Sequence, residues 1–397
     1  MFHKKSCTAL LLSAALLCTP LAAQPAQAAS DSNYQFQIIT KTNQYSSVYQ
    51  DAVYMRNGTL YVQLNDLVSH YGLQVSFDST GKRAGFNGWL KKIGIRDGSK
   101  TAVVDGKIVT MSQPAYFKKE KDSTEPVVYV PFKFAVEALG GTYVGYNVKT
   151  KVVTAKNLQN YDVVSTSYDG MTYAIEKSGG QVFSWDGKGK PVKIATLQGD
   201  LDWVDFKIRM TPKGLLLFSI SNSYGEPHIN SETYQLLFKD NKLIRQNHAD
   251  FGWGRPDLID TYNGQILMND SKKLRLIEDG TGNVVETIDL TKLGNKGADQ
   301  QYNVEEMDAD MMLIRNNHDY QLAVVDRSSG RSVTLYKQLL SVAEQKEIEL
   351  DNGGPMGNGD GLTYEKRVGN TLYFTFNPLF TSGKRTVTYN LDKLSGS

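Results

Sequence analysis

The sequence predicts a mainly β protein with a small, repeated α+β module followed by a β-propeller-like domain of about five blades. Two observations lead to this fold class. Up to residue 156 the chain repeats a short strand, a short helix, a glycine and a strand pair, which is typical of an α+β module. From residue 162 onward, short apolar runs alternate with Gly, Asn, Asp and Lys, which is typical of antiparallel strands.

Residues 1–28 have the features of a secretory signal peptide. Lys4-Lys5 precedes an apolar run from Thr8 to Leu17, and Ala26-Gln27-Ala28 is a small-x-small cleavage pattern. The apolar run is shorter than the roughly 20 residues that a membrane helix needs, and no later segment approaches that length. We therefore expect a secreted or extracellular protein without a transmembrane segment, either free or associated with the cell wall.

Composition excludes several function classes for the exported chain. Both cysteines, Cys7 and Cys18, lie in the leader, so we expect no disulfide, no thiolate nucleophile and no cysteine metal ligand. The leader holds two of the 44 basic residues and none of the 42 acidic ones, which leaves the mature net charge near zero. Bulk electrostatic attraction to nucleic acid is therefore not expected. The length exceeds one usual core and predicts two or more domains.

The α+β module is expected over residues 35–156, because residues 61–84 can be laid over residues 129–153 with one extra residue before the glycine. Each copy has an extended Tyr-Val, a short helix closed by glycine, and a pair of strands. Between the copies, residues 100–111 indicate a hairpin that turns at Asp105-Gly106. The apolar helical positions are Leu64, Leu67, Val68 and Tyr71 in one copy and Phe132, Ala135, Val136 and Leu139 in the other, and the closing glycines are Gly72 and Gly140.

The most specific segments of this module are YVPFKFAVEALGG at residues 129–141 and KTAVVDGK at residues 100–107. They resemble the copper amine oxidase N-terminal-like domain, a stalk module found widely in exported proteins of Gram-positive bacteria. That family usually has Trp-Asp where this chain has Phe77-Asp78 and Tyr146-Asn147. The resemblance implies a non-catalytic α+β module that serves as a spacer or holds a ligand.

A β-propeller-like domain is expected over residues 162–397. Short apolar segments recur there at spacings of about 44 to 60 residues, each followed by a polar loop and a second strand. Radial blades would bury the faces of such sheets and leave few open edges, and we expect about five blades with six left open. The segment at residues 161–168 is expected to close the ring, and a helix is expected at residues 338–349. The recurring segments begin at Asp169, Lys213, Asn263, Asp310 and Gly369.

Asn160-Tyr161-Asp162 raises the question of a quinone-forming tyrosine like that of copper amine oxidases. Such a site needs three histidines for copper, which favours imidazole ligands. The mature histidines are isolated in the sequence, and the family's large catalytic domain is absent. We therefore expect no oxidase activity, no metal and no cofactor, and we interpret Tyr161 as part of a linker or of a first strand. The histidines are His70, His228, His248 and His318.

The glycine-rich segment from Asp351 to Gly361 allows two interpretations. Its carboxylate, amide and carbonyl oxygens could bind calcium. It lacks the regular acidic spacing of a calcium loop, so a solvated surface loop is the favoured interpretation.

The candidate ligand-binding residues lie in the loops of the second domain. Trp203 and Trp253 occupy equivalent places in successive repeats, and Arg255 follows Trp253. If the strand order is right, Tyr224, His228 and His318 emerge on the same face. Tryptophan faces beside polar groups suit a neutral, hydroxyl-rich ligand such as a glycan. The alternative, which we favour slightly, is that both tryptophans pack between blades.

The sequence favours a non-catalytic binding protein of the cell envelope, whose partner is a polysaccharide or another exported protein and whose N-terminal module is a stalk or faces the wall. The alternative is an extracellular propeller hydrolase or lyase that acts on polysaccharide, with carboxylates from several blades meeting on the axis. A purely structural wall or spore protein is a third hypothesis. No group of residues in the sequence predicts nucleophilic or paired-carboxylate catalysis.

Overall fold

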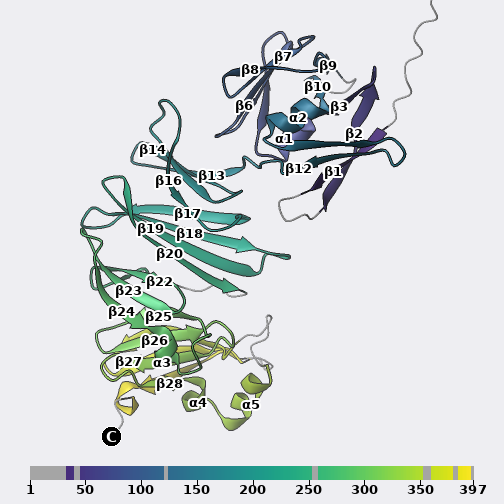
Figure 1. Cartoon of the computed structure of the whole chain (residues 1–397). Coiled ribbons are helices and arrows are strands. Elements are labelled where there is room, and N and C mark those ends of the chain that lie inside the picture. Colours follow the sequence, from purple (N-terminus) through teal and green to yellow (C-terminus); the bar gives the residue numbers. More distant parts are fainter. Residues whose placement is uncertain are drawn as a thin grey trace, which may run out of the picture. The chain divides into compact units, whose positions relative to one another are not determined.

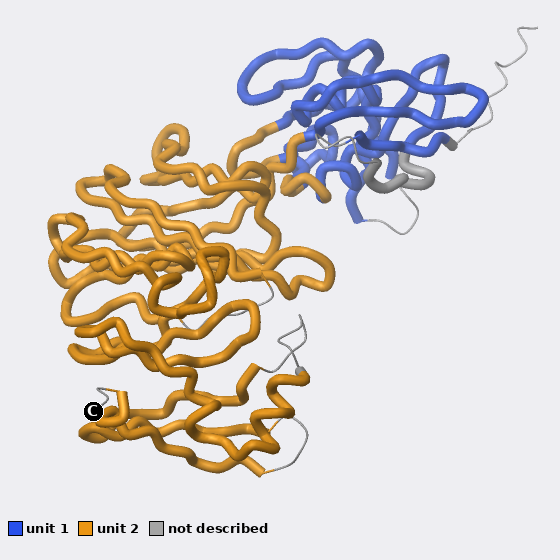
Figure 2. Tube along the Cα trace, turned by 60° about the horizontal axis from the view of Figure 1, so that its bottom comes forward, with its two compact units in different colours: residues 1–69, 75–86, 93–158 blue, residues 70–74, 87–92, 159–397 orange. Residues whose placement is uncertain are grey.

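The computed structural model describes residues 33–39, 45–119, 124–252, 258–351, 359–378 and 383–394. The leader at residues 1–28 lies outside these residues. The chain is mainly β, as the sequence predicts. It divides into two compact units, one of residues 1–69, 75–86 and 93–158 and the other of residues 70–74, 87–92 and 159–397 (Figure 2). No helix among the described residues is both long and apolar enough to span a membrane.

Unit 1 contains a large sheet and two short helices, each of which directly follows a strand of that sheet in the sequence. The seven strands of this sheet lie in the order β11-β12-β1-β2-β3-β10-β9, and β1 pairs with β12 in parallel (Figure 1). Its elements are β1 (Asn33–Ile39), β2 (Tyr45–Arg56), β3 (Thr59–Gln63), α1 (Leu64–Ser69), β9 (Tyr116–Lys118), β10 (Val127–Pro131), α2 (Phe132–Ala138), β11 (Thr142–Asn147) and β12 (Val152–Lys156).

A second sheet runs through the middle of the unit 1 sequence in the order β4-β5-β6-β7-β8. The predicted hairpin at Asp105-Gly106 is confirmed, since both residues have positive φ between β7 and β8. The predicted helices and their closing glycines are also confirmed, with Gly72 and Gly140 at positive φ. The strands are β4 (Gln74–Phe77), β5 (Arg83–Asn87), β6 (Lys92–Arg96), β7 (Thr101–Val104) and β8 (Lys107–Thr110).

The two sequence copies end in different sheets. In the first copy, α1 is followed by the strand pair β4 and β5 of the five-stranded sheet. In the second copy, α2 is followed by β11 and β12 of the seven-stranded sheet. Equivalent hairpins thus extend two separate surfaces of the module.

Unit 2 holds five antiparallel sheets among its described residues, and each is formed by strands that are consecutive in sequence. The first sheet is β13 (Val163–Tyr168), β14 (Met171–Glu176), β15 (Gln181–Trp185) and β16 (Val192–Thr196), and the second is β17 (Trp203–Met210), β18 (Leu216–Tyr224), β19 (Asn230–Lys239) and β20 (Lys242–Gly252). The third is β21 (Thr261–Tyr262), β22 (Gln265–Asn269), β23 (Lys273–Glu278) and β24 (Val284–Asp289). The fourth is β25 (Tyr302–Met307), β26 (Met311–Asn316), β27 (Leu322–Asp326) and β28 (Ser332–Thr334), and the fifth is β29 (Leu362–Val368), β30 (Thr371–Phe376) and β31 (Arg385–Asn390).

Each sheet packs on the next through a shared hydrophobic core. One core joins Ile175 of the first sheet to Phe218 of the second, and another joins Leu237 of the second to Ile266 of the third. Further cores join the third sheet to the fourth and the fourth to the fifth. Figure 1 shows the first sheet, in teal, at one end of this series and the fifth, in yellow, at the other. The five consecutive sheets fit the expected blades, whereas closure of the series into a ring is not seen among the described residues.

The prediction that the segment at residues 161–168 closes the ring is wrong. Residues 163–168 form β13, which pairs with β14 of its own sheet from Val163–Glu176 to Tyr168–Met171. Asp169 and Gly170, both at positive φ, make the two-residue turn between these strands. Such a turn holds the segment against its neighbour in sequence, so it adds no strand to the fifth sheet.

The predicted helix at residues 338–349 is found as two shorter helices between the fourth and fifth sheets. They are α4 (Tyr336–Leu339) and α5 (Val342–Asp351), and a further short helix, α3 (Leu290–Gly294), joins the third and fourth sheets. Tyr336 and Ile348 are buried in the core shared by the fourth and fifth sheets. The helices therefore extend that core.

Candidate ligand-binding site

The second sheet carries the candidate site at one end of its four strands. Trp203 begins β17, Tyr224 ends β18, and the loop of residues 225–229 leads to β19. The register places Trp203 opposite Ser223 and Tyr224 opposite Asn230. Three of the predicted ligand-binding residues, Trp203, Tyr224 and His228, therefore lie at the same end of one sheet.

Trp203 is an exposed aromatic side chain. It is 66% exposed, and its ring meets the His228 imidazole edge-on at 5.5 Å between centroids. The interpretation that Trp203 packs between blades is therefore wrong. A tryptophan face left in water beside a polar ring can cover an apolar surface of a ligand.

His228 is held by a tight turn and lies close to Asp202. Its backbone N–H donates to the carbonyl oxygen of Gly225 at 2.7 Å, and its φ of +65° lies in the left-handed region. Its Nδ1 lies 2.9 Å from a carboxylate oxygen of Asp202, without the geometry of a hydrogen bond. A residue other than glycine in the left-handed region costs conformational energy, which the hydrogen bond of the tight turn offsets here.

A buried polar network supports this end of the sheet. The Asp202 N–H donates to Oδ1 of Asn222 at 2.8 Å, and Nδ2 of Asn222 donates to Oε1 of Glu232 at 2.8 Å. The other oxygen, Oε2, accepts from the Tyr234 hydroxyl and lies 2.8 Å from Nε2 of His248. The rings of Tyr234 and His248 stack at 4.4 Å. The loop position of Asp202 thus depends on side chains from three other strands.

The network keeps Glu232 ionised. Burial opposes the charge, but the hydrogen bonds from His248, Asn222 and Tyr234 outweigh it, so the pKa of Glu232 lies below its usual value. Burial and the same carboxylate raise the pKa of Tyr234 well above its usual value. Burial and the hydrogen bond to Asp250 do the same for the pKa of Tyr224. Both hydroxyls therefore stay protonated and donate hydrogen bonds.

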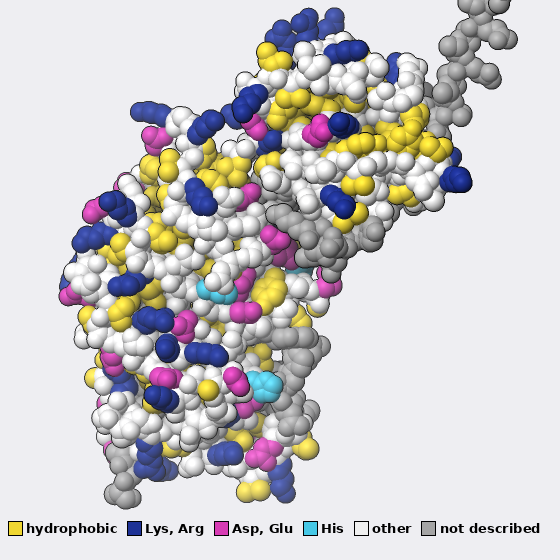
Figure 3. Space-filling view, in the orientation of Figure 1, with side chains coloured by type: hydrophobic (Ala, Val, Ile, Leu, Met, Phe, Trp, Pro, Cys, Tyr) yellow, Lys and Arg dark blue, Asp and Glu magenta, His cyan; other side chains and the backbone are white. Residues whose placement is uncertain are grey.

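Tyr224 is hydrogen-bonded to the end of β20. Its hydroxyl donates to Oδ1 of Asp250 at 2.8 Å, and that oxygen also accepts the Gly252 N–H at 2.9 Å. Trp253 and Arg255, which follow directly, lie outside the described residues, so their part in the site stays a prediction. Figure 3 shows histidine side chains beside acidic ones on the visible face of unit 2.

His318 lies in a different sheet from the other predicted residues. It is an exposed residue in the turn between β26 and β27, where its N–H donates to Oδ1 of Asn316. Among the described residues no contact joins it to Trp203, Tyr224 or His228. The prediction assumed that equivalent loops of different repeats lie on one face. His318 belongs to the fourth sheet, which the third sheet separates from the second.

Sequence reasoning missed the inner half of the site, namely Asn222, Glu232, Tyr234 and His248. A signal was present, because Glu232-x-Tyr234 and His248-x-Asp250 place polar and aromatic side chains on one face of their strands by alternation. Polar residues at these positions of otherwise apolar strands predict one buried polar cluster.

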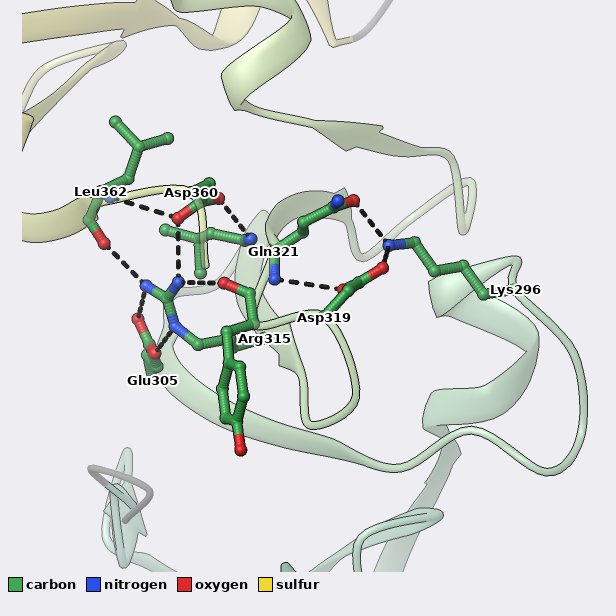
Figure 4. Close-up of polar contacts among 9 residues, drawn as sticks. Lys296, Glu305, Arg315, Asp319, Gln321, Asp360 and Leu362 are labelled. Atoms are coloured by element: carbon green, nitrogen blue, oxygen red, sulfur yellow. Dashed lines mark hydrogen bonds and ion pairs between the residues drawn. The ribbon is translucent and has the colours of Figure 1, made fainter. Parts of the chain in front are cut away.

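A second polar cluster surrounds Arg315 between the fourth and fifth sheets (Figure 4). Its guanidinium donates to Glu305, to Asp360 at 3.0 Å, and to the carbonyl oxygens of Tyr320 and Leu362. Burial opposes the charge, but Asp360 and Glu305 raise the pKa of Arg315 above its ordinary value. All the guanidinium nitrogens have protein partners, so this cluster clamps two sheets together.

Asp360 is a described acidic residue at the end of the glycine-rich segment. Its side chain is fully buried, and its carboxylate accepts the N–H groups of Leu322 and Leu362 in addition to the Arg315 pair. Asp360 is therefore not a solvated loop residue, and calcium binding by the segment as a whole stays a prediction. Residues 352–358 lie outside the described part of the chain. Within the described residues no group of three or more His, Cys, Asp or Glu side chains could hold a metal ion.

Tyr161 is a buried residue of the segment between β12 and β13, outside any strand. Its N–H donates to the carbonyl oxygen of Tyr71 at 3.0 Å, and its hydroxyl donates to Oε1 of Gln159 at 3.1 Å. The interpretation as a first strand is wrong, and that as a linker stays a prediction.

Solved structures resemble this chain only at very low TM-scores. A protein of unknown function from Bacteroides caccae has 10% identity, a TM-score of 0.22 and coverage of 76% of this chain and 81% of its own. Dihydro-heme d1 dehydrogenase NirN has 12% identity, a TM-score of 0.24 and coverage of 79% and 76%. A puromycin-hydrolyzing peptidase from Mycobacterium tuberculosis has 10% identity, a TM-score of 0.26 and coverage of 84% and 47%. These likenesses support no inference about the chain.

Comparison with curated proteins found no relative. A family model does match part of unit 1, over residues 41–124. This range includes α1 and the five-stranded sheet with its Asp105-Gly106 hairpin. The matching model is that of the copper amine oxidase N-terminal domain.

Proposed function

We propose that the protein is a non-catalytic binding protein of the cell envelope, and that the Trp203 end of the second sheet binds a neutral, hydroxyl-rich glycan. The observation that carries this proposal is an exposed Trp203 ring beside a His228 that a tight turn holds close to Asp202. The tryptophan face would cover the C–H surface of a sugar ring. His228 and Asp202 would bind its hydroxyl groups.

The supporting network favours binding because it fixes the site before a ligand arrives. Asp202 is joined through Asn222 to the buried Glu232, so little conformational freedom is left to lose on binding. Glu232 has a lowered pKa and accepts from three side chains. A glycosidase acid needs the opposite, a carboxyl with a raised pKa, so Glu232 is better suited to support than to acid catalysis.

The test is binding of the mature chain to immobilised neutral glycans, followed by calorimetry on the best one. We expect Trp203→Ala to weaken binding by about tenfold or more, as for an exposed aromatic anchor. Met210→Ala is the matched control, because Met210 is an exposed apolar residue at the other end of the same strand. Wild-type affinity in Trp203→Ala would overturn the proposal.

The same preparations distinguish the hydrolase alternative. The wild-type protein would be a hydrolase if it released new reducing ends from a bound polysaccharide and a Glu232→Gln variant still bound the polysaccharide but released none. Export is part of the proposal and is supported by the leader-like residues 1–28. Cell fractionation should recover the protein outside the cytoplasm, and recovery in the cytoplasm would contradict export.

A further inference from the structure

The five-stranded sheet of unit 1 has an open groove on one face, with a volume of about 530 Å³. Side chains from all five strands contribute to it, and none of them belongs to the site in unit 2. Its lining includes Ser76, Arg83, Gly85, Gly94, Arg96, Thr101, Val103 and Ile108. The groove therefore needs its own explanation.

The register explains why this face is hollow. Gly94 lies opposite Val103, and Val103 lies opposite Ile108. Two backbone hydrogen bonds give the register of β5 with β6: the Gly88 N–H donates to the Lys91 carbonyl oxygen, and the Asp97 N–H donates to the Lys82 carbonyl oxygen. Both bonds correspond to the same register, which places Gly85 opposite Gly94. Two adjacent glycines leave the backbone bare across two strands. They form the floor of the groove.

The same register places Arg83 directly opposite Arg96. Both side chains are exposed, and among the described residues neither guanidinium forms an ion pair. Like charges directly opposite each other destabilise an antiparallel pair, so the sheet retains an unfavourable contact that a bound anion would relieve. Arginine is also the side chain that best binds a carboxylate through two hydrogen bonds.

One carboxylate, Asp78, also lines the groove. Its Oδ1 accepts from the Thr80 hydroxyl and from the N–H groups of Lys82 and Arg83, which holds it in the turn before β5. Burial raises the pKa of Asp78, but these hydrogen bonds together outweigh it and lower the pKa below its usual value. Asp78 is therefore ionised, and together with Arg83 and Arg96 it leaves the groove with a net positive charge of two minus one, that is +1.

The other end of the groove is apolar. Val103 is 45% exposed and Ile108 is 78% exposed, so both offer surface that water covers in the free protein. In Figure 3, basic side chains gather beside hydrophobic ones where Figure 1 shows β6, β7 and β8. A ligand that fits must carry negative charge and also an apolar face.

We propose that this groove binds a strand of an acidic polysaccharide. Its sugar carboxylates would bind Arg83 and Arg96, and the C–H faces of its rings would lie on the Gly85–Gly94 floor and against Val103 and Ile108. An acidic sugar combines both properties in each repeat unit. This proposal is independent of the neutral-glycan site in unit 2 and could hold if that site fails.

The test is calorimetric titration of the mature chain with polygalacturonate oligomers, with dextran oligomers as the neutral comparison. The Arg83→Gln/Arg96→Gln variant should bind polygalacturonate about tenfold or more weakly, and its salt dependence should fall by about one log–log unit for each arginine. Its thermal stability should be equal or higher, because the like-charge contact is gone. Lys149→Gln/Lys156→Gln, an equal charge change elsewhere on unit 1, is the control.

A second variant tests the floor. A Cβ at position 94 would meet its nearest atom, in Val103, at 3.7 Å, which is ordinary contact, so Gly94→Val should fold and weaken polygalacturonate binding. Unchanged polygalacturonate binding in the double arginine variant and in Gly94→Val would overturn the proposal that the groove binds the polysaccharide. An equal loss of binding in the lysine control would show that the binding is non-specific charge attraction. Polyphosphate binding as tight as polygalacturonate binding, insensitive to Gly94→Val, would overturn the assignment to a sugar.

Discussion

Glu232 is the residue through which pH should act on the site. Its pKa is lowered in the folded protein, so its contribution to stability is present above the unfolded pKa of about 4.3 and is lost as pH falls through the folded value. Glu232→Gln should cost about 1–3 kcal/mol at pH 7, because it removes hydrogen bonds to a charged group. Melting temperatures of the two proteins should converge as the pH falls below about 4.3. A constant gap over that range would contradict this role.

Substitution of Asp360 should lower the stability of the fold more than substitution of a neighbouring, more exposed aspartate. Asp360→Asn leaves Arg315 buried with one carboxylate fewer, and breaking such a buried pair costs about 3–5 kcal/mol. The control is Asp319→Asn in the neighbouring, more exposed pair with Lys296, which should cost less than about 1 kcal/mol. Urea unfolding measures both. Equal effects would show that burial does not set the importance of Asp360.

Turns between strands were the most predictable elements of unit 2. The five segments singled out by their leading turn residues are the strands β14, β18, β22, β26 and β30, the second of each sheet. Asp-Gly and Asn-Gly turns act locally, so the sequence alone locates them. The first strand of each sheet was harder to place. Its partner follows it directly, but its apolar pattern is equally compatible with pairing to a distant strand.

The turn between β17 and β18 should depend on a neighbouring sheet. The buried Asp279, after β23, accepts from the Thr211 hydroxyl and from the Lys213 N–H at 2.9 Å. Asp279→Ala leaves these donors without a partner, which costs about 1–3 kcal/mol. Hydrogen exchange at residues 211–215 should then accelerate. Unchanged exchange there, with a normally folded protein, would mean that the turn is held by its own backbone.

The site in unit 2 could be predicted from the sequence only in its exposed part. Trp203, Tyr224 and His228 are neighbours because short loops of a single sheet carry them. The equivalence of His318 assumed that distant loops converge, which requires a ring. Local sequence fixes the strands of each sheet, but the rotation from one sheet to the next depends on cores such as that of Leu276 and Ile314, which side-chain packing decides.

The consecutive packing of the five sheets predicts that damage travels in one direction along the chain. Phe374 is fully buried in the core shared by the fifth and fourth sheets, and Phe374→Ala should cost about 3–5 kcal/mol. In an open series, each sheet depends only on its neighbours. Hydrogen exchange should therefore accelerate in β30 and β26 and stay unchanged in β14 of the first sheet. In a closed ring the fifth sheet would also support the first, so faster exchange in β14 at equal global stability would show that the ring closes.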